Sequence, residues 1–110
     1  MDRIVERIEN LKGGEGHVLL ERLIGEDVLD QKCKMFANVV VESGCSLGYH
    51  PHDGESETYY IISGSGIYQD NDKEYPVCAG DVLVCRLGNG HGIRNPHAEA
   101  LRFVALIIKG

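Results

Sequence analysis

The stretch His50-Pro51-His52-Asp53-Gly54-Glu55-Ser56-Glu57 decides the fold, because its polar residues have the spacing of metal ligands on β-strands. Side chains of alternate strand residues point to the same face, so His50 and His52 should project together. The four residues after His52 are turn formers. A hairpin closed by them would put Glu57 opposite His52, with Cβ atoms about 5 Å apart. With the downstream His91, the spacing predicts a metal site on neighbouring strands.

The sequence from Met35 onward is typical of a protein made of β-strands. Met35, Ala37, Val39 and Val41 recur at every second position, which is the period of a strand. Apolar stretches then follow at short intervals, separated by turn residues and without intervening helical patterns. This arrangement predicts an all-β sandwich or barrel. The expected strands are residues 35–42, 47–52, 57–63, 66–69, 74–77, 82–86, 91–95 and 101–108.

The N-terminal third of the chain leaves its secondary structure open. Ile4, Ile8 and Leu11 have helical spacing, so residues 2–11 form either a short helix or an extended arm laid across the barrel. Residues 17–24 are apolar-rich and fit a strand or a helix equally well. Residues 27–34 are expected to be a polar connection or a single helical turn.

Composition excludes several classes of function. The chain has 110 residues, a formal net charge of −6 and no run of Lys or Arg, which argues against nucleic acid as a partner. Its longest apolar stretch, residues 103–108, is far too short to span a bilayer, and no signal peptide opens the chain. The four cysteines have no C-x-x-C spacing and are interpreted as small buried hydrophobes in a reducing cytoplasm. We therefore expect a cytoplasmic protein.

The last expected strand, residues 101–108, is apolar on both faces. A strand of this kind needs cover on both sides. The second apolar face is covered either by the N-terminal segment or by another subunit, and a homodimer is the preferred explanation.

Two glycine-flanked patterns resemble the motifs of the cupin superfamily. The first family motif is a glycine, five residues, H-x-H, three or four residues, a glutamate, six residues and a glycine, and here every specified position is present. The second is a glycine, five residues, P-x-G, two residues, a histidine, three residues and an asparagine. Arg86 stands in that motif where the family has proline. The matching positions are Gly44, His50, His52, Glu57 and Gly64 in the first motif, and Gly80, Gly88, His91 and Asn95 in the second.

This resemblance implies a double-stranded β-helix, or jelly-roll barrel, with a metal inside one end. Residues 1–34 would be an N-terminal arm and the first barrel elements, and residues 35–110 the barrel core of a single domain. By the same resemblance, His50, His52, Glu57 and His91 carry over as ligands of one divalent transition metal ion. Manganese ranks first, as in oxalate decarboxylase-like cupins with this ligand set, while iron, nickel, cobalt and zinc stay open.

The expected activity concerns a small polar metabolite. The chain is expected to act on, or bind, a carboxylate in the manner of oxalate decarboxylase-like cupins. The alternative is a non-catalytic small-molecule or sugar-binding module. A metal-dependent enzyme is favoured, with decarboxylase, isomerase and dioxygenase unresolved. Tyr59 shares the strand face of Glu57 and Arg86 precedes His91, so both are candidates to bind the substrate, while Asn95 is expected to tie its strand to a turn.

Overall fold

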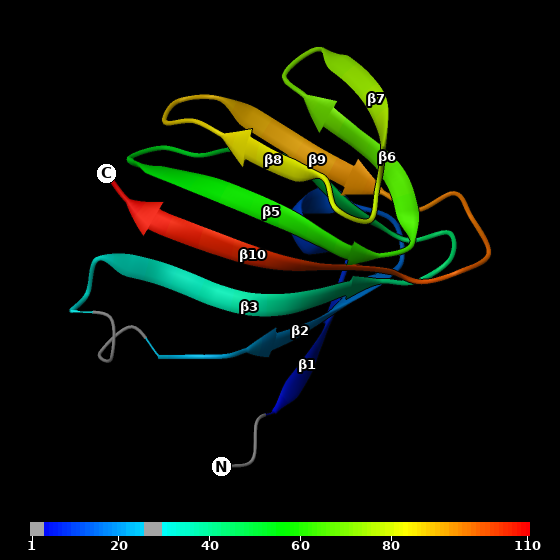
Figure 1. The fold of residues 1–110 in the computed structure, drawn as a ribbon, viewed down its shortest axis with the longest axis horizontal. Coiled ribbons are helices and arrows are strands. Elements are labelled where there is room, and N and C mark those ends of the chain that lie inside the picture. The colour runs from blue at the N-terminus through cyan, green and yellow to red at the C-terminus, as the bar shows by residue number, and fades with distance from the viewer. Residues whose placement is uncertain (1–3, 26–29) are drawn as a thin grey trace.

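The computed structural model describes residues 4–25 and 30–110, and almost all regular structure in these ranges is β-strand (Figure 1). Of the connection expected at residues 27–34, residues 27–29 lie outside the described part of the chain. The elements are β1 (Val5–Glu9), the 3₁₀ turn η1 (Leu11–Gly13), β2 (His17–Arg22), β3 (Cys33–Val41), β4 (Ser46–Pro51), β5 (Glu55–Ser63), β6 (Ser65–Asp70), β7 (Lys73–Cys78), β8 (Val82–Cys85), β9 (Gly90–Arg94) and β10 (Leu101–Lys109).

The strands form two antiparallel sheets that face each other in a jelly-roll barrel. The larger sheet has the strand order β1-β2-β3-β10-β5-β8, and the smaller has the order β4-β9-β6-β7. The chain changes sheet between β3 and β4 and again between β4 and β5, so successive strands in the sequence do not pair there (Figure 1). The prediction of an all-β jelly roll is confirmed.

The N-terminal segment is extended, not helical. β1 pairs with the edge of β2, with Val5 opposite Glu21, and so obtains its hydrogen bonds from the sheet. Asn10 and Lys12 both have left-handed backbone conformations, with φ of 50° and 55°, which a continuous α-helix does not allow. Residues 17–22 are likewise a strand. In the described ranges, no helix has the length and apolar character that crossing a bilayer requires.

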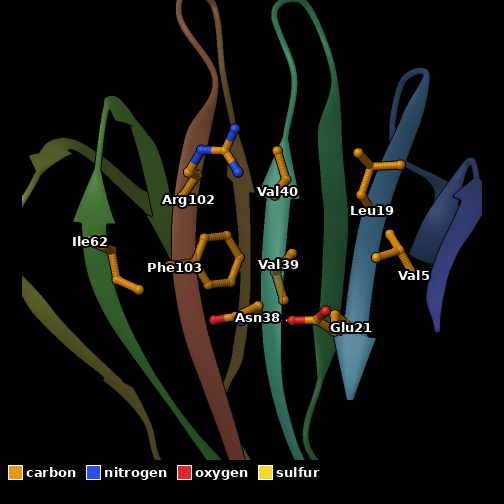
Figure 2. A pocket seen from close by; sticks show the side chains of 9 residues that line it. All are labelled: Val5, Leu19, Glu21, Asn38, Val39, Val40, Ile62, Arg102 and Phe103. Atoms are coloured by element: carbon orange, nitrogen blue, oxygen red, sulfur yellow. Dashed lines mark hydrogen bonds between the residues drawn. The ribbon is translucent and has the colours of Figure 1, made fainter. Parts of the chain in front are cut away.

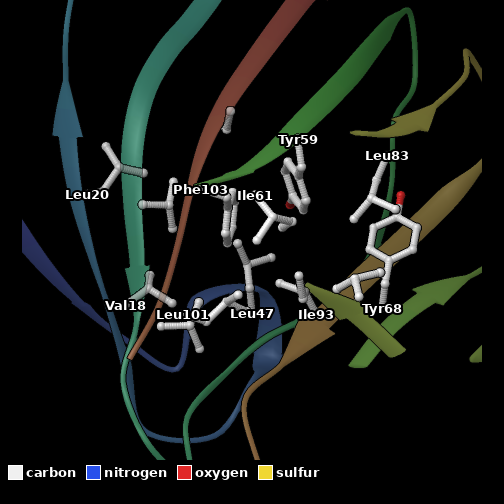
Figure 3. Close-up of a cluster of buried hydrophobic side chains, with 14 of the residues drawn as sticks. Val18, Leu20, Leu47, Tyr59, Ile61, Tyr68, Leu83, Ile93, Leu101 and Phe103 are labelled. Carbon is white, nitrogen blue, oxygen red and sulfur yellow. The ribbon is translucent and has the colours of Figure 1, made fainter. Parts of the chain in front are cut away.

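The core lies between the two sheets and is mainly aliphatic. Burying one such side chain contributes about 1.5–3 kcal/mol. In Figure 3 the labelled side chains of both sheets point into the shared interior. The core is closed by Tyr59 and Tyr68 near the predicted metal ligands. Its largest fully buried apolar members are Tyr59, Tyr68, Phe103, Ile61, Leu101, Val18, Val39 and Val41.

The outer face of the larger sheet carries exposed apolar side chains. Tyr60, Ile62, Val82 and Val84 are each half exposed or more. A groove crosses this face over β10, β3 and β2, with Ile62 and Val5 at its two sides (Figure 2). Because β1 extends the sheet at its edge, residues 4–9, the described part of the N-terminal segment before the turn η1, do not cover this face.

Candidate metal centre

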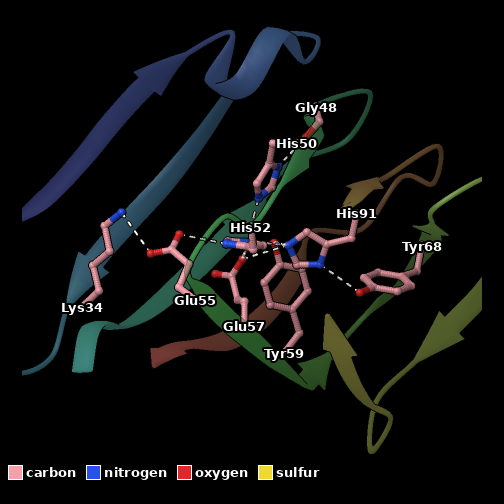
Figure 4. Close-up of polar contacts among 9 residues, drawn as sticks. All are labelled: Lys34, Gly48, His50, His52, Glu55, Glu57, Tyr59, Tyr68 and His91. Atoms are coloured by element: carbon pink, nitrogen blue, oxygen red, sulfur yellow. Dashed lines mark hydrogen bonds and ion pairs between the residues drawn. The ribbon is translucent and has the colours of Figure 1, made fainter. Parts of the chain in front are cut away.

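Four buried side chains converge at one end of the barrel: His50 from β4, His52 directly after it, Glu57 from β5 and His91 from β9 (Figure 4). One potential ligand atom from each lies within 4.8 Å of the corresponding atoms of the others. The strand alternation that suggested a common direction for His50 and His52 holds, since both side chains are buried while Pro51 between them is exposed.

The strand pairing around the site differs from the expected hairpin. β4 pairs with β9, where His50 is the Cα partner of His91. β5 pairs with β10 and β8, so Glu57 is not opposite His52 in a hairpin. That prediction was wrong because the connection at residues 52–54 crosses from one sheet to the other. Glu57 nevertheless reaches His52, since the two sheets face each other across the barrel interior.

The distances between the donor atoms fit one metal ion. Oε1 of Glu57 lies 2.8 Å from Nε2 of His52, 2.9 Å from Nε2 of His91 and 3.8 Å from Nε2 of His50, and the Nε2 atoms of His52 and His91 are 3.0 Å apart. Metal–nitrogen and metal–oxygen bonds of about 2.1 Å place adjacent octahedral donors about 3 Å apart. Three imidazole nitrogens with one carboxylate oxygen therefore suit a divalent transition metal ion.

A separate hydrogen-bond partner orients each imidazole. Nδ1 of His50 donates to the carbonyl oxygen of Gly48 at 2.8 Å. Nδ1 of His52 donates to a carboxylate oxygen of Glu55 at 2.9 Å. These two bonds put the proton on Nδ1 and leave the Nε2 lone pair for a metal, as partners of metal-binding histidines do.

The third imidazole is held from the opposite side of the site. Nδ1 of His91 lies 2.8 Å from the hydroxyl oxygen of Tyr68. Figure 4 shows the resulting arrangement, in which Glu55 stands behind His52 and Tyr68 stands behind His91. The Nε2 atoms of all three histidines consequently point toward Glu57.

The electrostatics of the metal-free site are dominated by burial and by contacts with Glu57. Burial by itself raises the pKa of the Glu57 carboxyl, but hydrogen bonds from the three imidazoles outweigh it and hold that pKa far below its usual range. The hydrogen bond to Glu57 raises the pKa of His52. Burial lowers the pKa of His91 despite its contact with Glu57. The site thus keeps an ionised carboxylate for a cation.

Three of the four residues of the ligand group line a cavity of about 230 Å³. His50, His52 and Glu57 contribute to its wall together with Tyr59. Most of the remaining wall is apolar, and three cationic side chains also line it. These other residues are Ile8, Leu11, Lys12, Leu20, Arg22, Lys34, Met35, Val39, Leu47, Glu55, Phe103, Ala105 and Ile107.

The two predicted substrate-binding residues occupy different places. Tyr59 is buried, lines the cavity and has its hydroxyl oxygen 3.5 Å from Nε2 of His91. Burial raises the pKa of the Tyr59 hydroxyl well above its usual value, so it keeps its proton. Arg86 is exposed on the turn after β8 and does not line the cavity, so its contact with a ligand stays a prediction.

Asn95 ties its strand to a turn, as expected. Its Nδ2 donates to the carbonyl oxygens of Val41 at 2.9 Å and Glu99 at 2.7 Å. Its Oδ1 accepts a hydrogen bond from the backbone of His97 at 2.9 Å. Asn95 therefore has a structural role behind β9.

Sequence reasoning missed the residues that orient the imidazoles. Gly48, Glu55 and Tyr68 lie outside the ligand spacing, and strand alternation does not say which histidine each would reach. The contact of Glu55 could have been suspected, because an acidic residue shortly after His52 is close enough in sequence to accept a hydrogen bond from it. Tyr68 becomes a partner of His91 only through the pairing of β6 with β9.

Known proteins resemble this chain over nearly its full length. The family model described as "Cupin domain" matches residues 37–107. The "Oxalate-binding protein" of Thermotoga maritima is 41% identical over 103 residues, which cover 94% of this chain and 85% of that protein.

Solved structures agree with the fold. A predicted oxalate decarboxylase from Thermotoga maritima superposes with a TM-score of 0.96 at 38% identity, covering 99% of this chain and 95% of that one. A Cupin 2 conserved barrel domain protein from Salinispora arenicola gives a TM-score of 0.73 at 25% identity, covering 84% and 76% of the two chains.

Proposed function

The chain belongs to the cupin family, and we propose that it binds one divalent transition metal ion and, at that ion, a small carboxylate such as oxalate. The observation that carries the proposal is the convergence of three imidazole nitrogens and one carboxylate oxygen beside a cavity of about 230 Å³, which three of the four residues line. The choice of carboxylate is supported by the oxalate-related names of a similar protein and a similar solved structure, both from Thermotoga maritima.

The proposed ligands are His50, His52, Glu57 and His91, and manganese is the first choice of metal. A bound ion would supply a Lewis acid that polarises the oxygens of a carboxylate. Four protein ligands on an octahedral ion leave two positions for such a ligand. The hydroxyl of Tyr59, which keeps its proton, would donate a hydrogen bond to the bound carboxylate.

Binding is favoured over turnover by the contacts of Glu55. Decarboxylation requires a proton donor beside the substrate, and Glu55 lines the cavity. One of its oxygens is engaged by His52 at 2.9 Å and the other by Lys34 at 3.1 Å, and these two bonds hold its pKa below the usual range although burial opposes them. Glu55 is therefore an ionised structural partner, not an acid.

The cavity wall also favours a carboxylate over a sugar. A sugar needs hydrogen-bond partners around most of its hydroxyl groups, because an unpaired buried polar group costs about 1–3 kcal/mol. Away from the metal ligands, most of the wall consists of aliphatic and aromatic side chains. A compact anion that binds the metal through its oxygens leaves fewer groups unpaired.

Calorimetric titration of the manganese-loaded protein with oxalate tests the proposal. We expect saturable binding at one site per chain, and no binding to protein stripped with a chelator. His52→Ala should lose both metal and oxalate, whereas His97→Ala, which changes an exposed histidine, should keep both. Absence of oxalate binding to fully loaded wild-type protein would contradict the proposal, and release of carbon dioxide during the titration would favour a decarboxylase instead.

We also propose that the chain is a homodimer joined through the outer face of the larger sheet. The half-exposed Tyr60 and Ile62 lie on this face. Glu21 and Arg102, of opposite charge, flank the apolar centre of its groove, so a two-fold axis can pair them between copies (Figure 2). Light scattering should give the mass of a dimer for wild-type protein and of a monomer for Ile62→Glu.

The matched control for the dimer is Tyr75→Glu, which changes an exposed residue of the smaller sheet. We expect this variant to keep the dimer mass. A monomer mass for the wild-type protein would overturn the dimer.

The cytoplasm is the proposed compartment, since all four cysteines are free thiols and disulfides are rare there. Titration of the denatured protein with a thiol reagent should count four thiols without prior reduction. A lower count would contradict this placement.

A further inference from the structure

Positive charge is concentrated around the cavity although the chain as a whole is acidic. Lys12, Arg22 and Lys34 all line the cavity, together with the carboxylates of Glu55 and Glu57. Three positive and two negative groups give the wall a charge of +1, or +3 with a divalent ion, in a chain of net charge −6. A local positive potential of this kind attracts and orients anions.

An apolar band shares the cavity with the charged and metal-binding groups. It includes side chains from β1, β2, β3, β4 and β10, as well as the 3₁₀ turn η1. At about 30 Å³ of liquid volume per water molecule, a cavity of about 230 Å³ holds roughly eight waters. This exceeds what the six non-hydrogen atoms of oxalate fill. The space fits a ligand with a short aliphatic segment.

Among the three cations, Lys12 is the one without an ion-pair partner in the described residues. Nζ of Lys34 lies 3.1 Å from Glu55, and Nε of Arg22 lies 3.5 Å from Glu6. Over residues 4–25 and 30–110, Lys12 makes no ion pair. Its ammonium group is therefore free to bind an anion without breaking an internal contact.

The backbone around Lys12 is fixed against the metal-binding strand. A Cβ added at Gly48 would overlap the carbonyl oxygen of Lys12, so the turn η1 and strand β4 touch through bare backbone. The carbonyl oxygen of the same Gly48 accepts the hydrogen bond that orients His50. Nδ2 of Asn10 braces the turn by donating to the carbonyl oxygen of Gly14 at 3.0 Å. The backbone of Lys12 is thereby held in a fixed position relative to the metal ligands, and its exposed side chain extends from there.

We propose that Lys12 determines ligand specificity by binding the second carboxylate of a 2-hydroxy or 2-oxo dicarboxylate. The first carboxylate of this ligand and the adjacent oxygen would coordinate the metal ion. Its aliphatic segment would lie along the apolar wall, and its far carboxylate would form an ion pair with Lys12. This inference rests on the proposed function, since it requires a metal ion at His50, His52, Glu57 and His91.

The test compares two ligands of equal length on the manganese-loaded protein by calorimetry. 2-Hydroxyglutarate carries the second carboxylate, and 2-hydroxypentanoate lacks it. We expect wild-type protein to bind the dicarboxylate about tenfold more tightly or better, because a charge-assisted hydrogen bond contributes about 1.5–3 kcal/mol. Lys12→Met should bring the two affinities together, while leaving the manganese content unchanged.

Two further variants control the experiment. Lys12→Arg keeps the positive charge and should retain most of the preference for the dicarboxylate. Lys73→Met removes an exposed lysine of the smaller sheet that does not line the cavity, and it should bind as the wild type does.

The outcomes separate this inference from the proposed function. Two results would overturn the role of Lys12 while carboxylate binding stands, provided that oxalate binds. In the first, Lys12→Met keeps the preference for the dicarboxylate. In the second, the wild type has no preference for the dicarboxylate. If no carboxylate binds to fully loaded protein, both are overturned.

Discussion

His50 and His91 are Cα partners on adjacent strands, and their ring centroids lie 4.7 Å apart. The antiparallel pair of β4 with β9 thus supplies two histidines of the site, and His52 follows directly after β4. Glu57 comes from β5 in the opposite sheet. A metal ion bound to all four residues would therefore link the two sheets of the barrel.

Metal binding should depend on His52 and should stabilise the fold. Wild-type protein is expected to hold one ion per chain, measured by elemental analysis, and to unfold at a higher temperature when loaded, because a ligand that binds only the native state stabilises it. His52→Ala should lose the ion and this thermal shift. His97→Ala should keep both, and equal metal content in the two variants would contradict the assignment.

Tyr68 should tune metal affinity without touching the metal. Tyr68→Phe removes the hydroxyl that lies 2.8 Å from Nδ1 of His91. Loss of such a partner lowers metal affinity by about 10- to 100-fold, which competition with a chromogenic chelator can measure. Tyr60→Phe, on the exposed outer face, is the matched control and should leave affinity unchanged. An unaltered affinity in Tyr68→Phe would show that the bond does not orient His91 for binding.

The metal-free protein should lose stability in acid because of Glu57. Its pKa is lower in the folded than in the unfolded chain, so its stabilising contribution is complete above the unfolded value of about 4.5 and is lost as the pH falls toward the folded value. The shifts of His52 and His91 have opposite signs, so their effects near neutral pH oppose each other. Urea unfolding of chelator-treated protein between about pH 3 and 7 measures this dependence.

The variant Glu57→Gln tests how much of the loss of stability in acid comes from Glu57. The variant should show a flatter decline of the free energy of unfolding below about pH 4.5 than the wild type does. Glu99→Gln, which changes an exposed carboxylate, should follow the wild-type curve. Equal slopes for the wild type and Glu57→Gln would contradict the electrostatic account of the site.

Gly64 should tolerate a side chain much less well than Gly80. Both have positive φ, 81° and 95°, so alanine costs about 1–2 kcal/mol at either position. At Gly64 the added Cβ would also overlap the carbonyl oxygen of Ala100, whereas at Gly80 it meets nothing within 4 Å. Urea unfolding should show a loss for Gly64→Ala that exceeds the loss for Gly80→Ala by about 1 kcal/mol or more. Equal losses would mean that the backbone near Ala100 relaxes.

The sequence was sufficient for the strands from Met35 onward and for the grouping of His50, His52, Glu57 and His91. Strand alternation depends only on the two-residue period of the backbone, so it placed His50 and His52 on one face without knowledge of their neighbours. The glycine spacing around them indicated the family. The sequence could not decide between helix and strand at residues 2–11, because that choice depends on hydrogen bonds with β2, which lies further along the chain.

Only the tertiary structure decided which strands meet at the site and what surrounds it. Glu57 faces His52 across the barrel and not within a hairpin, because the connection after β4 changes sheet. The contacts of Glu55 with Lys34, of Tyr68 with His91 and of η1 with Gly48 join residues far apart in the chain or in different sheets. The four residues of the candidate metal site could be found from two motif spacings in the sequence, whereas the groups that orient them and shape the cavity are brought together by long-range packing, which no short motif encodes.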